Sequence, residues 1–295
     1  MRALGYAARW QYGEYKYKTG GNMQPKRVDY LSYEPEGNGI LWIKFNRPDR
    51  LNALYGLAEQ DSTMAKVGEY MRAGDADPNI RVIVLTGVGK AFCAGADMKS
   101  RSTEQLSDPG VDGTRQHFSE HFTPLFRDIS MIRKPTIAMV NGAAVGAGLD
   151  MALHCDIRLG CENTRFFTYQ NVGQIPENGA LYLLPRIVGM GRALELFFTG
   201  GFLEAEEAYR WGLLNHLYAS EELESKTREL CDRIINSPPL VQWISKRIMR
   251  TAMDTSLEAT MQLTANASGI LDRSEDSREA RKAFLEKRAP TYKGR

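Results

Sequence analysis

The chain of 295 residues carries 38 Lys and Arg against 36 Asp and Glu, a formal net charge of +2. Hydrophobic residues make up 43% and charged residues 25%, which is the balance of a globular protein and excludes a wholly disordered chain. A near-neutral charge supplies no global field for nucleic acid or an anionic membrane, and no apolar stretch is long enough to span a bilayer. We therefore expect neither a nucleic-acid partner nor a membrane partner.

The four cysteines show no C-x-x-C spacing, and the N-terminus lacks the apolar stretch of a secretory signal. This pattern predicts reduced thiols and a cytoplasmic location. Residues 1–27 differ from the rest, because they hold six basic side chains, one acid and five aromatic rings. We interpret them as an N-terminal extension of the main fold, while a basic-aromatic segment also suits single-stranded nucleic acid or phosphate groups.

Strands and helices alternate through the first half of the chain, which predicts an α/β layer built from crossover units. We expect strands over residues 27–32, 39–45, 80–86 and 136–140, helices over 56–72, 116–132 and through Leu153, and a loop over 100–113. After Pro185 the pattern predicts helices only. The chain thus divides into an α/β core over residues 28–200 and a C-terminal helical region over 201–295.

Residues 117–121 match the H-x-x-E-H pattern of one class of zinc peptidase, with His117 and His121 on one face of a helix. The other histidines have no clear claim to be the third ligand that such a site requires. We therefore predict no metal site, and a helix that faces a pocket instead.

Two glycine- and alanine-rich segments follow predicted strands, Phe92–Asp97 and Asn141–Gly148. Small residues let the backbone approach a ligand closely, and the start of a helix presents unpaired N–H donors. Two such segments can direct two N–H groups at a single oxygen, as an oxyanion hole does. Either segment alone is equally consistent with tight packing, but the carboxylate of Asp150 in the next turn favours chemistry on a carbonyl.

Six motifs in this order and spacing resemble the crotonase superfamily, the enoyl-CoA hydratase/isomerase group, from about residue 28 to the C-terminus. They are Asn46-Arg-Pro, Val84-Leu-Thr-Gly, Ala91–Asp97, Lys134–Gly142, Cys155-Asp-Ile157 and Leu184–Gly189. The resemblance implies a spiral of ββα units with a C-terminal helical trimerisation region, in a homotrimer or a hexamer of paired trimers. It also implies an acyl-CoA thioester as substrate, with no cofactor apart from the coenzyme A of the substrate.

By the same resemblance, the backbone N–H groups of Ala96 and Ala147 occupy the two oxyanion-hole positions. They would stabilise the enolate that forms when charge moves onto the thioester oxygen. Ala147 stands where the family usually has glycine, but a backbone donor tolerates the added methyl group. Ala94, Asp97 and Gly146 are expected to contact the substrate beside them.

The acid/base positions depart from those of a standard hydratase, which uses two glutamates. The first falls on Asp150, and the second falls near Tyr169, which is not a carboxylate. Glu177 lies four residues after Gly173, where dienoyl-CoA isomerases of the family carry an aspartate. Asp150, Glu177 and Tyr169 are therefore the candidate catalytic residues. Stabilisation of a helix start by Asp150 and an exposed loop position for Glu177 remain open, whereas Asp156 is expected to be structural.

Aromatic and basic side chains complete the expected substrate site. Phe166, His117 and Phe122 would line the acyl group, with core packing as the competing role for each aromatic ring. Near the C-terminus, Phe284 and Lys287 resemble the family segment that meets coenzyme A, often across a subunit interface. Lys287 at a helix end is also consistent with ordinary compensation of the helix dipole.

These residues predict an acyl-CoA enzyme that works through an oxyanion-stabilised enolate, an enoyl- or dienoyl-CoA isomerase or an enoyl-CoA hydratase. A second hypothesis is a CoA-thioester hydrolase, or a ring-cleaving or dehalogenase-like enzyme that uses Glu177. A third is a noncatalytic homologue that binds coenzyme A or RNA.

Overall fold

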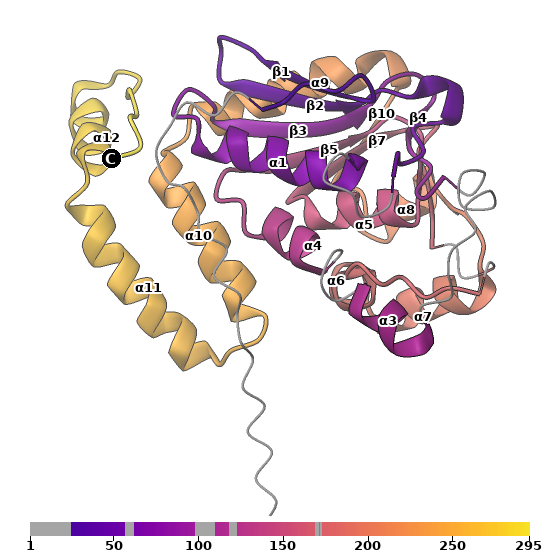
Figure 1. Cartoon of the computed structure of the whole chain (residues 1–295). Helices are drawn as coiled ribbons and strands as arrows, with labels where there is room; N and C mark the ends of the chain where they lie inside the picture. Colours follow the sequence, from indigo (N-terminus) through magenta and orange to yellow (C-terminus); the bar gives the residue numbers. More distant parts are fainter. Residues whose placement is uncertain (1–24, 57–61, 98–109, 118–122, 169–170, 172) are drawn as a thin grey trace, which may run out of the picture.

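The computed structural model describes residues 25–56, 62–97, 110–117, 123–168, 171 and 173–295 (Figure 1). Two β-sheets form the core. The larger has the order β1-β2-β3-β5-β7-β10 and the smaller the order β4-β6-β8-β9. The strands of the larger sheet are Leu31–Pro35, Ile40–Phe45, Val82–Gly87, Thr136–Val140, Ile157–Cys161 and His216–Tyr218. Those of the smaller sheet are Ala91–Cys93, Ala143–Val145, Arg165–Phe167 and Leu203–Glu204.

A repeating unit places one strand in each sheet and then a helix. β3 and β4 are followed by α3 (Gly110–His117) and α4 (Thr123–Ser130), β5 and β6 by α5 (Ala147–His154), and β7 and β8 by α6 (Ala180–Val188). Strands β2, β3, β5, β7 and β10 pair in parallel, as do β4, β6 and β8. This is the predicted spiral of ββα units.

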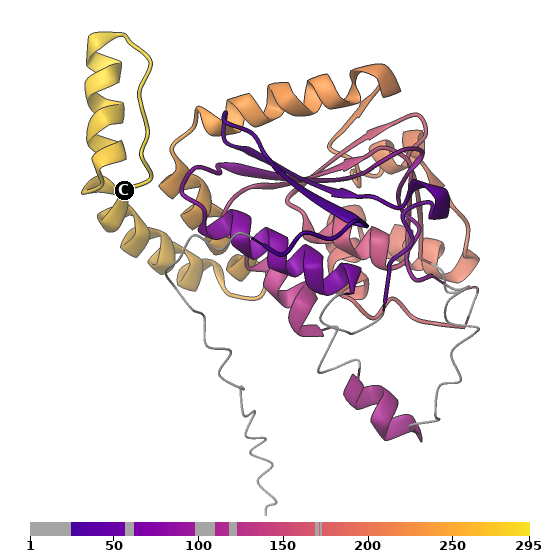
Figure 2. The same cartoon turned by 45° about the horizontal axis from the view of Figure 1, so that its top comes forward.

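The larger sheet is covered on both faces. In Figures 1 and 2, α1 (Thr63–Ala76), α4 and α5 lie on one side of it and α9 (Ser220–Ile235) on the other. Alternate residues of β2 belong to different hydrophobic clusters, Leu41 and Ile43 to one and Ile40 and Trp42 to the other. Because side chains alternate along a strand, a continuous apolar run is what a sheet buried on both faces requires.

The prediction of helices alone after Pro185 is wrong at two places. β9 pairs with β8 and β10 pairs with β7, so the chain adds strands to both sheets as far as Tyr218. Strands of two and three residues are too short to show an alternating pattern. In addition, α9 buries Leu223 and Cys231 against the larger sheet, so the core continues past the expected boundary at residue 200.

The remaining helices are α7 (Met190–Thr199), α8 (Ala205–Arg210), α10 (Pro239–Ala252), α11 (Leu257–Asp272) and α12 (Glu275–Glu286). In both views α11 and α12 lie beyond α10, away from the sheets (Figures 1 and 2). Of the predicted elements, the strands over 39–45, 80–86 and 136–140 match β2, β3 and β5, whereas the expected strand over 27–32 is found four residues later. The expected loop over 100–113 gives way to α3 at Gly110.

The described residues also bear on the composition arguments. All four cysteines are free and buried, as the absence of paired spacing predicts. Within the described ranges, no helix has the length and apolar character needed to cross a bilayer. The same ranges contain no cluster of three or more His, Cys, Asp or Glu side chains able to hold a metal ion. The segment 1–24 lies outside the described residues.

Candidate active site

The two glycine-rich segments lie side by side, so close together that two of their glycines have no room for a side chain. A Cβ on Gly148, in the first turn of α5, would lie 2.3 Å from the Cys93 carbonyl oxygen at the end of β4. A Cβ on Gly95 would lie 2.6 Å from the Val145 carbonyl oxygen and 3.7 Å from the Ala147 nitrogen. Gly95 and Gly146 also have positive φ angles, of 78° and 53°, which glycine adopts without strain. The fold therefore brings the segments of Ala96 and Ala147 together, as predicted.

The backbone amides of Ala96 and Ala147 have no hydrogen-bond acceptor among the described residues. Ala147 is the first residue of α5, and the first intrahelical bond runs from the Asp150 amide to the Gly146 carbonyl at 2.9 Å. Near Ala96 it is the neighbouring Gly95 carbonyl that accepts a bond, at 2.8 Å from the Leu54 amide. Among the hydrogen bonds of the described residues, neither the Ala96 nor the Ala147 amide is engaged. Two such donors can hold one developing oxyanion.

Asp150 lies one helical turn after Ala147, on the same face of α5. The side chain is 1% exposed, and its Oδ2 accepts a hydrogen bond from Asn178 Nδ2 at 3.0 Å. The other oxygen, Oδ1, has no hydrogen-bond partner among the described residues. The carboxylate also accepts a bond from the Ala180 amide at the start of α6, so it joins α5 to the turn before α6, and the unpartnered Oδ1 is the atom that suits a catalytic role.

Burial and, to a smaller extent, the nearby charge of Glu177 raise the pKa of Asp150 from 3.8 to about 7, against the opposing bonds from Asn178 and the Ala180 amide. A general base works best when its pKa lies near the working pH. Asp150 is therefore suited to take a proton from a substrate and give it back at neutral pH.

Glu177 is half-buried in the turn before α6, and its charge acts on Asp150. The structure thus brings these two predicted carboxylates to one place. Asn178, which lies between Glu177 and α6, is tied to α5 twice: its amide bonds Asp150, and its carbonyl contacts His154 Nε2 at 2.8 Å. The turn that carries Glu177 is fixed to both ends of the helix that carries Asp150.

Ala94, Asp97 and Gly146, which we predicted to contact the substrate, form bonds or ion pairs with other parts of the chain. The Ala94 amide donates to the Leu51 carbonyl at 3.1 Å. The Asp97 carboxylate forms an ion pair of 3.1 Å with Arg47, whose guanidinium also bonds the Ala53 carbonyl at 2.6 Å. Gly146 is buried, and its amide bonds the Phe167 carbonyl at 2.9 Å. All three therefore shape the two segments that present the amides.

The structure gives Phe166 the competing role that the sequence left open, core packing. Its side chain is 0% exposed and belongs to the main hydrophobic cluster, so it has no free surface for a ligand. Phe284 is 83% exposed on α12, and Lys287 follows that helix with a φ of 52°. Within one chain α12 lies far from α5 in both views, so contact of these two residues with a ligand stays a prediction that needs a second subunit (Figures 1 and 2). Tyr169, Phe122 and the His117 side chain lie outside the described residues.

Sequence reasoning missed Asn178 and His154 at this site. Asn178 is 28 residues from Asp150 and His154 is 24 residues from Asn178, and neither belongs to a motif. The sequence offered one signal for Asn178: it is a polar residue directly after the candidate acid Glu177, in a stretch of turns.

Comparison with known proteins gives one consistent family. The family description "Enoyl-CoA hydratase/isomerase" matches residues 35–295. The 1,2-epoxyphenylacetyl-CoA isomerase of Escherichia coli K12 is 32% identical over 259 residues, covering 87% of this chain and 96% of that protein. The crotonyl-CoA hydratase of Syntrophomonas wolfei is 33% identical over 258 residues, covering 86% of this chain and 93% of that protein.

Solved structures agree. The crystal structure of an enoyl-CoA hydratase/isomerase from Cupriavidus metallidurans CH34 superposes with a TM-score of 0.81 at 31% identity, covering 90% of this chain and 96% of the other. The fold, the paired glycine-rich segments and these comparisons lead to one conclusion: the chain belongs to the enoyl-CoA hydratase/isomerase family, the crotonase superfamily.

Proposed function

We propose that this enzyme moves a double bond within an unsaturated acyl-CoA, through an enolate of the thioester. The observation that carries the proposal is the buried carboxyl of Asp150, which lies one helical turn from the Ala147 amide, a donor with no acceptor among the described residues. Burial raises the pKa of this carboxyl to about 7. An isomerase needs a group that removes a proton from one carbon of the substrate and returns it to another. The name of the Escherichia coli relative, an isomerase acting on an acyl-CoA, supports this choice.

In the proposed reaction the thioester oxygen accepts hydrogen bonds from the Ala96 and Ala147 amides. Asp150 takes a proton from a carbon of the acyl chain, and the electron pair of that C–H bond moves through the chain to the thioester oxygen. When the electrons return, a carboxyl group delivers a proton to a different carbon, and the double bond has moved. Protons and electrons balance without an oxidant, and we propose no cofactor beyond the coenzyme A of the substrate.

Glu177 is proposed as the second proton-handling group, because its charge is close enough to raise the pKa of Asp150. Hydration is the second candidate, since two carboxylates can also hold and activate a water, and relatives include the crotonyl-CoA hydratase. It ranks second because the position of the usual second glutamate falls near Tyr169.

Incubation with a panel of enoyl- and dienoyl-CoA thioesters in deuterated water tests both candidates. Isomerisation predicts a moved double bond, with deuterium at the carbon that receives the proton, and no gain of water in the mass of the product. Hydration predicts a hydroxyacyl-CoA instead. Absence of turnover and of deuterium exchange across the panel would overturn the proposal.

A homotrimer, or a hexamer of paired trimers, is proposed as the working assembly. The C-terminal helices expose an unusual number of large apolar side chains, which a neighbouring subunit would cover. They are Met249, Leu257, Met261, Ile270, Phe284 and Leu285. Light scattering on the purified protein measures the mass directly. We also propose a cytoplasmic location, which the four free, buried thiols support.

A further inference from the structure

His154, the last residue of α5, is a buried histidine whose two ring nitrogens both have partners. Nε2 lies 2.8 Å from the Asn178 carbonyl oxygen, and Nδ1 contacts the Ser130 hydroxyl at the end of α4. A carbonyl oxygen only accepts, so Nε2 must carry the proton and donate it. Nδ1 is then the acceptor, and Ser130 must donate its hydroxyl hydrogen to it. The contacts leave one tautomer for His154.

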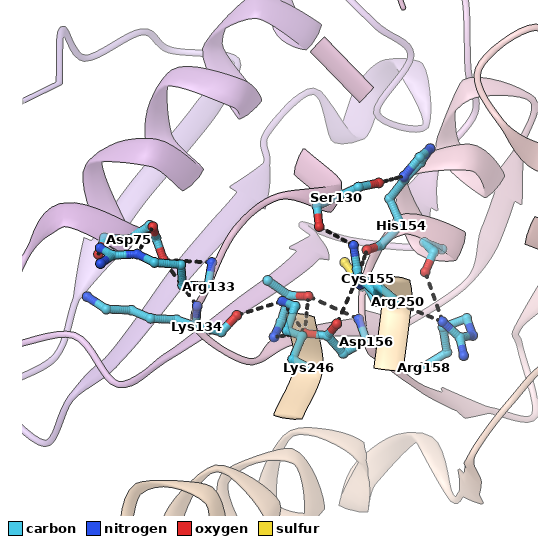
Figure 3. Close-up of polar contacts among 12 residues, drawn as sticks. Asp75, Ser130, Arg133, Lys134, His154, Cys155, Asp156, Arg158, Lys246 and Arg250 are labelled. Carbon is cyan, nitrogen blue, oxygen red and sulfur yellow. Dashed lines mark hydrogen bonds and ion pairs between the residues drawn. The ribbon is translucent and has the colours of Figure 1, made fainter. Parts of the chain in front are cut away.

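The imidazole is also held neutral. Burial and, to a smaller extent, the Arg250 charge lower the pKa of His154 to about 4, against the bond to Asn178. Arg250 reaches this point from α10: its guanidinium bonds the carbonyl oxygens of Ser130 and His154 and pairs with Asp156 at 2.8 Å (Figure 3). The ends of α4 and α5 are thereby fixed to each other around the ring of His154.

We propose that His154 is a positioning residue for catalysis: its Nε2–H holds the backbone of Asn178, so that the Asn178 amide bonds Asp150 and Glu177 stays beside that carboxyl. The series runs from Ser130 through His154 and Asn178 to Asp150, with every donor and acceptor assigned. It explains why a polar ring occupies a site that is 8% exposed and packed against Phe126. The inference rests on the proposed role of Asp150 as the base.

The same geometry limits which groups act on Asp150. Glu177 is the charged neighbour from the turn before α6, and Asn178 and the Ala180 amide supply the hydrogen bonds. From β4, the thiol of Cys93 stays neutral, since burial raises its pKa to about 12. At the C-terminal end of α5, the charge of Arg250 acts on His154. If Asn178 leaves Asp150, the carboxylate loses its only side-chain hydrogen bond among the described residues, and its pKa rises further.

The test measures the titration of Asp150 by infrared spectroscopy in the absence of substrate, with the band identified by its loss in Asp150→Asn. We expect His154→Phe and Asn178→Ala each to raise the pKa of Asp150, and to lower kcat/KM at pH 7 by about five- to tenfold, the worth of one hydrogen bond. In the double variant the two effects should not add, because His154 acts through Asn178. His154→Gln, whose amide can donate to the same carbonyl, should restore the wild-type titration.

Two further variants separate positioning from packing. Phe126→Leu loosens the ring that packs on His154, at 5.2 Å between centroids, without touching Asn178. It should lower the melting temperature and leave the titration of Asp150 unchanged. Ser130→Ala frees the tautomer of His154 and should raise the pKa of Asp150 by less than His154→Phe does, which keeps the test usable if His154→Phe does not fold.

Three outcomes would overturn the proposal: an unchanged titration in Ser130→Ala and His154→Phe, additive effects in the double variant, or an equal shift in Phe126→Leu. Because the infrared titration requires no turnover, it reports on His154 even if no acyl-CoA of the panel reacts. Failure of the proposed reaction and failure of the positioning role are therefore distinguishable.

Discussion

Two aspartates six residues apart, Asp150 and Asp156, lie near the two ends of α5 and have opposite surroundings. Asp156, just past the C-terminal end, accepts bonds from the Thr136 amide and hydroxyl at 2.8 and 2.9 Å and pairs with Lys246 and Arg250 at 2.6 and 2.8 Å. Asp150, in the first turn, faces no cation among the described residues and has one oxygen without a partner. Figure 3 shows Asp156 with Lys246 and Arg250 beside it.

The difference separates a structural carboxylate from a reactive one. A carboxylate has about four lone-pair sites, and around Asp156 the fold fills them with donors and positive charge. Around Asp150 it supplies no positive charge among the described residues and only the bonds from Asn178 and the Ala180 amide, so the charged form is costly and the carboxyl keeps its proton up to a pKa of about 7. The same residue type on one short helix thus joins elements at one end and handles protons at the other.

The largest expected effect is on activity, in Asp150→Asn. Asparagine keeps the shape and the packing but cannot take a proton, so kcat/KM should fall by about 10²–10⁴. Steady-state kinetics with the substrate found in the panel measure the loss, and circular dichroism checks the fold. A variant that kept more than a tenth of wild-type activity would remove Asp150 from the role of base.

The second largest effect on activity is expected for Gly148→Ala, which tests the close contact of α5 with β4. The new Cβ would meet the Cys93 carbonyl oxygen at 2.3 Å, and this neighbour is backbone, so α5 must shift away from β4. Because the shift separates the Ala96 and Ala147 amides, we expect kcat to fall by roughly 10- to 1,000-fold, the upper value being that of a lost oxyanion donor.

Gly269→Ala is the matched control for that variant. Gly269 lies within α11, and a Cβ there would have no neighbour within 4 Å among the described residues of its own chain. Alanine in a helix interior should stabilise the protein by about 1 kcal/mol and leave kcat unchanged. Equal kinetics of the two glycine variants would show that the contact between α5 and β4 does not hold the amides in place.

Asp156→Asn should sharpen the comparison from the other end of the helix. It leaves Lys246 and Arg250 without their shared counter-charge, and the Lys246 ammonium is mostly buried, with a side chain 12% exposed. We expect a loss of about 2–4 kcal/mol in the free energy of unfolding, measured in urea, with kcat retained within about threefold at 25 °C. A loss of activity as large as that of Asp150→Asn would mean that the two carboxylates do not have separate roles.

The sequence was informative where function depends on backbone. Gly146 and Gly148 next to Ala147 predicted a close approach and a free helix start, because few other residues fit such a turn. Asn178 and His154 were missed because their contacts join residues 24 and 28 positions apart, and local patterns carry no information on such pairs. The order of the ββα units followed from the strand pattern and the family resemblance together.

Phe166 shows a second limit. Neighbouring residues of a strand point to opposite sides, so one of the pair Phe166 and Phe167 had to enter the core. Composition alone does not say which, and the structure buries Phe166 completely while leaving Phe167 half-buried. The short strand β9 beside them was missed for a related reason: a strand of two residues is defined by its partner and not by its own sequence.

The last expected effect, smaller than those on activity and than that of Asp156→Asn, is on the pH dependence of stability. The pKa of Asp150 is raised from 3.8 to about 7 in the folded protein, so between these pH values the native state binds the proton that the unfolded chain releases. The free energy of unfolding contributed by this group therefore falls as the pH rises from 4 to 7. His154, with a pKa lowered from 6.5 to about 4, acts with the opposite sign in the same window, since the unfolded chain binds its proton first.

Asp150→Asn separates the two contributions, because His154 is common to the variant and the wild type and cancels in their difference. Urea unfolding at pH 5 and at pH 8 should show the stability of the variant rising relative to wild type, by on the order of 1–3 kcal/mol between the two pH values. A difference that stays constant would mean that Asp150 is already ionised at pH 5. Its low-dielectric surroundings would then not distinguish it from Asp156, and the contrast between the two ends of α5 would rest on hydrogen bonding alone.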